Sequence, residues 1–256
     1  MQAQSMSFVR ALHTYSKYSL KSRVINWLSN SSLHPPYTHV VPIGDPVLRV
    51  ATKDVDLDRI TSNEIQKIIN NMKLVLKRYN ACGISGPQLG VPISIFAIQC
   101  TKQQLYWADK TEIISKGMTE TPFKVFINPK IKLIGESNVT HREGCCSMNY
   151  YSALVTRHSE VIVSGYNESG KYETWTAKNW NARIVQHEMD HLNGYLFVDK
   201  MQSPQSLEFQ YWKSVNAKQG NFRISFDGYT AFKKFSNFYP LLFIPFVPLF
   251  IFFQQT

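Results

Sequence analysis

The first 44 residues contain no aspartate or glutamate, although they carry four Lys and Arg residues, and the first 40 include eight serines. They also lack the continuous apolar run of a secretory signal. Two short segments, residues 8–12 and 24–28, are compatible with amphipathic helix. This pattern favours an organellar presequence, with a disordered basic leader as the alternative. His34-Pro35-Pro36 is typical of a linker into a folded domain.

Cysteine is also scarce, and charge of one sign is concentrated at the ends of the chain. Four cysteines in 256 residues are too few for a disulfide framework, so we expect a reducing compartment. Of the net charge of +10, residues 1–44 contribute +4 and residues 204–256 contribute +3. The middle is therefore only mildly basic, and its aromatic residues are not interleaved with Lys and Arg. No specific nucleic-acid partner is predicted.

A hydrophobic run long enough to span a membrane is missing as well. Residues 240–253 are almost wholly apolar, but the segment has only fourteen residues, and three of them are proline. Such a segment is short for a membrane span and poor for a helix. A tail that packs on something, a weak membrane contact and an aberrant C-terminus are all preferred to a span.

The first regular structure is expected after residue 43. Residues 44–49 predict a turn followed by an extended segment. Thr61 and Glu64 match a capping box, and apolar residues then recur at helical spacing as far as Tyr79. This helix is expected to serve core packing and to carry no site.

Strand signals dominate the middle of the chain. A loop of small residues at 83–90 precedes a strand at 93–98, which is the wrong order for a phosphate-binding loop. A strand over 124–134 is predicted to break at Asn128-Pro129. A hairpin turns at 167–170. Strands clustered ahead of one late helix predict an α+β fold.

That late helix carries His187-Glu188-Met189-Asp190-His191. Histidines four residues apart lie one turn apart on one helical face, so both rings can reach a single metal ion. Glu188 is close enough to exchange protons with water at that ion. A solvated, charged helix face without a metal is the alternative.

A catalytic metal site needs a third protein ligand. A third histidine six residues after His191 would indicate a metzincin peptidase, but that position is Phe197. Upstream, Cys145 is the attractive candidate, because a thiolate with two imidazoles suits Zn²⁺ or Fe²⁺. If Cys145 and Cys146 lie on a strand, only one of them can face the metal. The alternative is that both are small buried apolar residues.

With these motifs in place, the chain resembles the peptide deformylase family over roughly residues 40–215. Three ordered motifs are far more specific than one. The segments that carry the resemblance are residues 83–88, 143–147 and 186–191, with shorter matches at 44–49, 126–129 and 153–157. Residues 180–183 and 211–212 are similar to the mitochondrial branch, in agreement with the presequence interpretation.

The resemblance implies the chemistry. Cys145, His187 and His191 would hold one divalent metal ion, Fe²⁺ or Zn²⁺ with Co²⁺ as a third option. Glu188 would take a proton from the attacking water and return it to the leaving amine. The substrates would be N-formylmethionyl nascent peptides, and the products formate and a peptide with a free amine.

The resemblance also implies the surroundings of the reaction. Gln88 and the backbone N–H of Cys146 would stabilise the developing oxyanion. The backbone at Cys82, Gly83 and Gly144 would pair with the extended peptide.

Trp180 and Arg183 would form walls of the methionine pocket, and Glu143 and Arg157 an ion pair. Departures from the family pattern, such as Gly86 in place of alanine, affect peptide binding more than metal chemistry.

The expected organisation has three parts. Residues 1–40 are a mitochondrial presequence and linker, residues 41–216 a catalytic domain, and residues 217–256 an extension of unknown role. The enzyme is expected in the mitochondrial matrix, with ribosome proximity and a homodimer left open. A zincin-type metallopeptidase and a catalytically silent relative are the rival functions.

Overall fold

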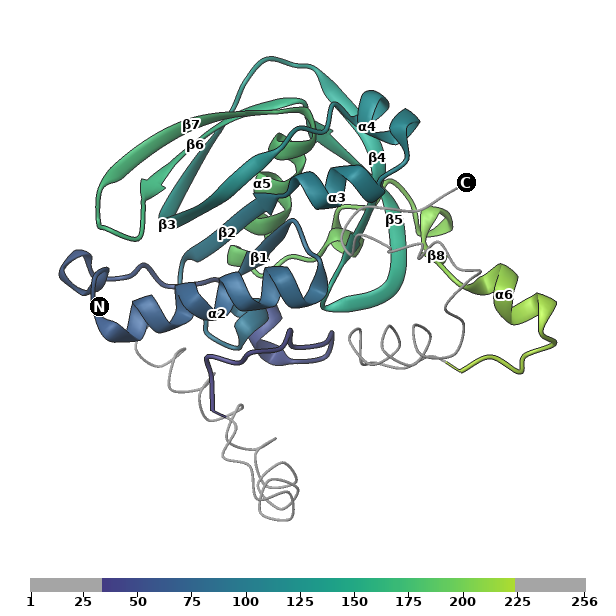
Figure 1. Ribbon diagram of the computed structural model, residues 1–256, viewed down its shortest axis with the longest axis horizontal. Helices are drawn as coiled ribbons and strands as arrows, with labels where there is room; N and C mark the ends of the chain where they lie inside the picture. Colours follow the sequence, from purple (N-terminus) through teal and green to yellow (C-terminus); the bar gives the residue numbers. More distant parts are fainter. Residues whose placement is uncertain (1–33, 224–256) are drawn as a thin grey trace, which may run out of the picture.

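The computed structural model describes residues 34–223. Two antiparallel sheets pack around one central helix, α5 (Figure 1). The larger sheet has five strands in the order β1-β2-β3-β6-β7. Its strands are β1 (Gly83–Ser85), β2 (Ile95–Cys100), β3 (Thr121–Leu133), β6 (Glu160–Tyr166) and β7 (Tyr172–Lys178). The predicted α+β class is confirmed.

The smaller sheet has three strands in the order β4-β5-β8. It is dominated by the long β4–β5 hairpin, in which Glu143 pairs with Ala153 and Gly144 with Ser152. Its strands are β4 (Asn138–Cys145), β5 (Met148–His158) and β8 (Glu208–Phe209). Both β1 and β4 are therefore edge strands of their sheets.

The α-helices are α2 (Asn63–Tyr79), α3 (Lys102–Trp107), α4 (Lys110–Lys116), α5 (Asn179–Leu192) and α6 (Trp212–Ala217). Short 3₁₀ turns connect them at Pro46–Arg49, Leu57–Arg59, Pro87–Leu89, Phe197–Asp199 and Pro204–Ser206. Helix α2 buries the predicted apolar stripe against the five-stranded sheet. Helix α5 contacts strands of both sheets. None of the helices among residues 34–223 is long and apolar enough to cross a membrane.

Several local predictions are wrong. The N-cap of α2 is Ser62, whose Oγ accepts from Ile65 N at 3.4 Å, and not Thr61. The segment that follows Asp45 is a 3₁₀ helix over Pro46–Arg49 where an extended segment was expected, because the Asp45 side chain caps Val47 N–H at 3.0 Å.

Strand β3 runs through Asn128-Pro129 without a break. The ladder instead shifts register between Ile127 and Lys130, and Asn128 has φ of 52°. The Asn128 side chain bonds Val55 N and O at 2.8 and 2.7 Å, which satisfies two backbone groups of the neighbouring segment. The hairpin at 167–170 is confirmed.

The predicted linker is partly packed on the fold. Tyr37 N donates to Leu89 O at 2.9 Å, and Asn71 Nδ2 donates to Pro36 O at 3.0 Å. The two amphipathic segments at 8–12 and 24–28, and the apolar tail at 240–253, lie outside the described residues.

Candidate metal centre and active site

Helix α5 is positioned by its buried face and by the way it ends. Ile184, Val185 and Leu192 are buried in the main core. At the C-terminus, Gly194 adopts φ of 78°, so that Tyr195 N can donate to Asp190 O at 2.9 Å and close a Schellman motif. The helix therefore ends at Leu192, one residue after His191.

Three donor side chains converge on one point. The ligand atoms of Cys145, His187 and His191 all lie within 4.8 Å of one another, and all three residues are buried. Cys145 Sγ is 3.2 Å from His191 Nε2. The two histidines come from α5, and the cysteine comes from the end of β4 in the three-stranded sheet. Long-range packing therefore completes a group of which the helix supplies two members.

The vicinal thiols are separated in space. Cys145 ends β4 and packs with Ala153, Val155 and Phe197, whereas Cys146 opens the turn and joins the main core. Burial would raise the pKa of Cys145, but the charges of and hydrogen bonds to His191 and His187 hold that pKa well below its usual range. Burial raises the pKa of Cys146, as does the charge on Cys145. Of these two thiols, Cys145 is thus the one predisposed to be a thiolate ligand.

Glu143 orients the first of the histidines. Its carboxylate is fully buried, and Oε2 lies 3.1 Å from His187 Nδ1. Arg157 makes a two-point contact, with Nε and Nη2 at 2.9 and 3.0 Å, which confirms the predicted ion pair. Burial would raise the pKa of Glu143, but the charge of Arg157 and the hydrogen bond from His187 hold it well below its usual range. A carboxylate behind a ligand histidine fixes its ring orientation.

Two members of this network were not predicted for it. Asp190, inside the helix motif, accepts from Arg157 Nη1 at 2.6 Å. Arg183 Nη1 donates to Glu143 Oε1 at 2.7 Å and to Val155 O at 2.8 Å. Asp190 lies inside the motif at residues 187–191, so the sequence already indicated that it would be close to the site. Nothing local indicates the partners of Arg183.

Glu188 has a contrasting environment. Its side chain is fully buried, yet neither carboxylate oxygen has a hydrogen-bond partner among residues 34–223. Burial raises the pKa of Glu188 to about 7, against the opposing charges of His187 and His191 and a smaller lowering by the nearby Ser85 hydroxyl. That hydroxyl donates to Gln88 Oε1, so it does not hold the Glu188 carboxylate. A carboxylate whose pKa lies near neutrality can both accept and return a proton.

Gln88 is held with its amide nitrogen toward the metal ligands. Its Oε1 accepts from Ser85 N at 3.0 Å and from Ser85 Oγ at 3.1 Å. An amide oxygen that accepts from a backbone N–H leaves the NH₂ group on the other side. Nε2 accordingly lies 3.5 Å from Cys145 Sγ and 3.4 Å from Ser147 Oγ. Ser85 and Ser147, which the sequence did not single out, thus set the orientation of this donor.

The remaining expected site residues lie on the two edge strands, directly before β1, and at the start of α5. Gly83 is in β1 and Gly144 in β4, while the carbonyl of Cys82, just before β1, accepts from Gln99 N in β2 at 2.9 Å. Trp180 is buried, with the His141 ring 6.4 Å away and Lys116 Nζ 5.0 Å above it.

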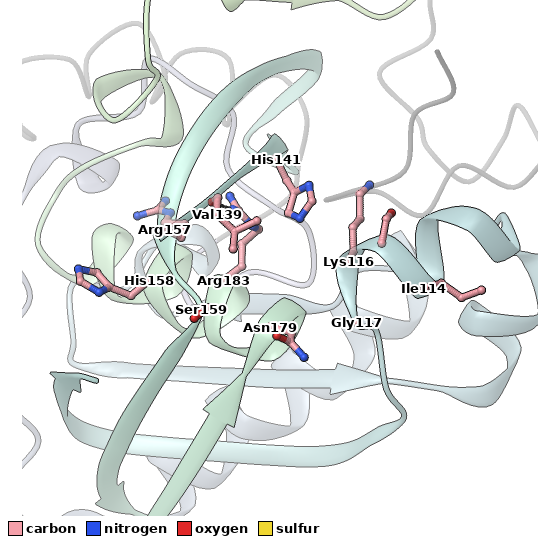
Figure 2. Close-up of a pocket in the computed structure, with 11 residues that line it drawn as sticks. Ile114, Lys116, Gly117, Val139, His141, Arg157, His158, Ser159, Asn179 and Arg183 are labelled. Carbon is pink, nitrogen blue, oxygen red and sulfur yellow. Dashed lines mark hydrogen bonds between the residues drawn. The ribbon is translucent and has the colours of Figure 1, made fainter. Parts of the chain in front are cut away.

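A separate pocket of about 160 Å³ opens beside this part of α5. It lies between the end of α4, the β4–β5 hairpin and the N-terminus of α5, with Lys116 and His141 facing each other across it (Figure 2). Arg183 and Arg157 contribute to its lining, but both guanidinium groups are also bonded to Glu143. Arg157 also pairs with Asp190 at 2.6 Å, and Lys116 pairs with Glu112 at 2.9 Å, so the Lys and Arg charges at this pocket are largely neutralised by protein carboxylates.

A buried thiol and two imidazoles, beside a carboxylate that no group within residues 34–223 hydrogen-bonds, form the donor set of a mononuclear metallohydrolase. The family model described as polypeptide deformylase matches residues 37–206. This chain belongs to that family.

Relatives and solved structures agree. The mitochondrial peptide deformylase of Homo sapiens is 37% identical over 182 residues, which is 71% of this chain and 74% of that protein. The chloroplastic peptide deformylase 1A of Solanum lycopersicum is 42% identical over 164 residues, covering 63% of this chain and 58% of the plant protein. A Synechococcus elongatus peptide deformylase in complex with actinonin superposes with a TM-score of 0.55 at 29% identity, covering 74% of this chain and 90% of that one.

Proposed function

We propose that this protein is a metal-dependent hydrolase that removes the N-formyl group from the formylmethionine of newly made proteins and releases formate. One observation carries the proposal. In a chain of the deformylase family, the ligand atoms of Cys145 from β4 and of His187 and His191 from α5 lie within 4.8 Å of one another.

The residues present fit one divalent metal ion. Three buried soft and borderline donors suit Fe²⁺ or Zn²⁺, and Co²⁺ is a third option. The low pKa of Cys145 favours the thiolate that a metal requires, and Glu143 holds the ring of His187. When bound, the metal supplies Lewis-acid chemistry, polarising the formyl carbonyl and lowering the pKa of water.

Glu188 is proposed to move the proton. Its buried carboxylate accepts the proton of the attacking water and returns it to the amine nitrogen as the C–N bond breaks. Returning the proton is the harder task, because an amide nitrogen leaves readily only when it is protonated. Glu188 adjoins His187 along α5, and neither of its oxygens is committed to a protein hydrogen bond within residues 34–223.

Gln88 and the backbone N–H of Cys146 are proposed to stabilise negative charge on the formyl oxygen. The Gln88 Nε2 group already points toward Cys145, held there by Ser85. Because its orientation is set before substrate arrives, little reorganisation accompanies the reaction.

Backbone for the extended peptide is proposed to come from Gly83 in the edge strand β1, from Cys82 immediately before it, and from Gly144 in the edge strand β4. Trp180 and Arg183 are proposed as walls of the methionine pocket. Since the Arg183 guanidinium is bonded to Glu143 and to Val155 O, its apolar stem is the part that we assign to the methionine side chain.

The rival functions have weaker support. A zincin-type peptidase needs a downstream third ligand, but the candidate ligand group among the described residues contains Cys145, and Phe197 is buried against that cysteine. A catalytically silent relative would not need to keep Glu188 and the three donors together. All proposed groups lie on one chain, so the chemistry needs no second subunit.

The mitochondrial matrix is the proposed compartment. The human relative is mitochondrial, the tomato relative is chloroplastic, and residues 1–44 are basic and free of acids. Formylated N-termini belong to newly made chains, which brings the enzyme close to the organellar ribosome. A reporter fused to residues 1–45 should enter mitochondria, and diffuse cytosolic signal would contradict this localisation.

The activity is tested by formate release from a formyl-Met peptide, using the full chain. We expect turnover that a chelator abolishes and that Fe²⁺ or Zn²⁺ restores. The acetyl-Met peptide of the same sequence is the matched control and should not react. Cleavage inside either peptide would indicate a peptidase, and a metal-loaded protein without turnover would indicate a silent relative.

A further inference from the structure

Strand β1 approaches helix α5 unusually closely at one residue. A Cβ atom placed on Gly83 would lie 2.3 Å from Glu188 Oε1, 2.9 Å from Glu188 Cδ and 2.9 Å from Ile184 Cγ2. Ordinary van der Waals contact begins near 3.4 Å. The carboxylate of Glu188 thus occupies the space that a side chain at residue 83 would fill.

Glycine is required at this position for space and not for backbone conformation. The glycines with φ in the left-handed region are elsewhere, as at Gly90 and Gly194, and Gly83 is not among them. Gly83 pairs with Ile98 in the antiparallel ladder of β1 and β2, a conformation open to alanine. An added methyl group would therefore act only through what it touches.

Of the groups that such a methyl would touch, Glu188 is the one that can move furthest. Strand β1 is held by its ladder with β2, and Ile184 is packed in the main core, where it can give only slightly. The Glu188 carboxylate is the end of a flexible side chain, and it has no hydrogen-bond partner among residues 34–223 to hold it. The Ile184 methyl group must also give, but only by about 0.5 Å to regain ordinary contact, whereas the Glu188 carboxylate must move by roughly 1 Å. A displacement of that size can cost about 100-fold in rate at a reacting centre.

We propose that Gly83 is a positioning residue for Glu188, which places the proton-transferring carboxylate by leaving room for it. This inference rests on the proposed function and adds to the backbone role of Gly83 in peptide binding. It predicts a loss in kcat through Glu188, whereas weakened peptide pairing would raise KM.

The test is a double-mutant cycle of Gly83→Ala and Glu188→Gln in the full, metal-loaded chain. Formate release from a formyl-Met peptide is measured alongside metal content. We expect Gly83→Ala to keep its metal and to lower kcat about 100-fold, with KM changed by less than about threefold. In the Glu188→Gln background the same substitution should cost little further, because the group that it displaces no longer transfers a proton.

A second pair protects the test against misfolding of Gly83→Ala. Glu188→Asp withdraws the carboxylate by one methylene, so Gly83→Ala/Glu188→Asp should fold, bind metal and turn over as Glu188→Asp does. Multiplicative losses in both cycles, a change confined to KM, or a wild-type kcat in Gly83→Ala would overturn the inference. Wild-type protein that holds metal but releases no formate would instead overturn the proposed function.

Discussion

Two fully buried carboxylates lie beside His187, and the protein surrounds them in opposite ways. On the side of α5 that faces β4 and β5, Glu143 accepts from Arg157, Arg183 and His187. On the side that faces β1, Glu188 accepts no hydrogen bond from any of residues 34–223. The pKa of Glu143 is held well below its usual range, whereas burial raises that of Glu188 to about 7.

The contrast fits a structural role for Glu143 and the proposed proton-transferring role for Glu188. A buried carboxylate saturated by cations stays ionised and holds its partners in place, but it has no capacity left for a proton. A buried carboxylate without partners is unfavourable for folding and can exchange a proton near neutral pH. The two neighbouring thiols also have different surroundings. Cys145 packs against β5, whereas Cys146 is in the main core.

The largest expected effect comes from the thiols. Cys145→Ala should lose the metal and all turnover, because two imidazoles remain where three ligands are needed. Cys146→Ala should keep both, since its proposed role belongs to the backbone. Metal analysis of the purified variants is the measurement. Equal metal loss in both would show that the wrong sulfur was assigned.

Removing the charge of Glu143, the carboxylate that three side chains hydrogen-bond, should destabilise the fold. Glu143→Gln leaves Arg157 and Arg183 buried without their shared charge, and we expect a loss of about 3–5 kcal/mol in the free energy of unfolding. Metal affinity should also fall about 10–100-fold, because His187 loses its orienting partner. Urea unfolding and metal titration measure the two effects. Glu136→Gln, at an exposed position, is the control, and an equal stability for both variants would refute the role of Glu143.

The equivalent substitution of the second carboxylate, Glu188, should lower turnover without affecting the fold. Glu188→Gln should keep the metal and the stability of the wild type, because Glu188 accepts no protein hydrogen bond among residues 34–223. Turnover should fall roughly 100-fold or more, the scale of general acid–base catalysis. Formate release from metal-matched proteins is the measurement. Near-equal rates would remove Glu188 from the mechanism.

An exposed carboxylate–arginine pair provides the smallest effect and a reference for the buried one. Asp199 pairs with Arg49, their side chains being 31% and 45% exposed. Burial opposes the shift, but the hydrogen bond from Arg49 and the one from Leu196 N–H lower the pKa of Asp199. Asp199→Asn should therefore cost less than about 1 kcal/mol at pH 7.

The pH dependence of that small difference follows from its sign. Because the pKa of Asp199 is lowered on folding, its contribution is present above the ordinary value of 3.8 and is lost as pH falls through the folded value. The free energy of unfolding of the wild type and of Asp199→Asn, measured at pH 7 and at pH 3, tests this. A difference that grows on acidification would contradict it.

Local pattern was sufficient where a segment is long and periodic. The stripe of α2 and the helix that carries His187 and His191 follow from 3.6-residue spacing. Short elements were missed. Helices α3 and α4 depend on the caps at Thr101 and Asp109 more than on any apolar period. At Asn128, the pattern indicated a break, but the side chain bonds Val55, a contact 73 residues away that no local signal contains.

The sequence by itself determined which atoms would meet along α5, because the pitch of a helix places His187 and His191 one turn apart wherever that helix lies. Tertiary structure decided what those atoms are used for. Packing of two sheets against α5 brings Cys145 to the histidines, gathers the arginines on Glu143 and leaves Glu188 beside Gly83. Contacts between distant segments depend on how whole surfaces pack together, and the spacing of residues along the chain does not predict that packing.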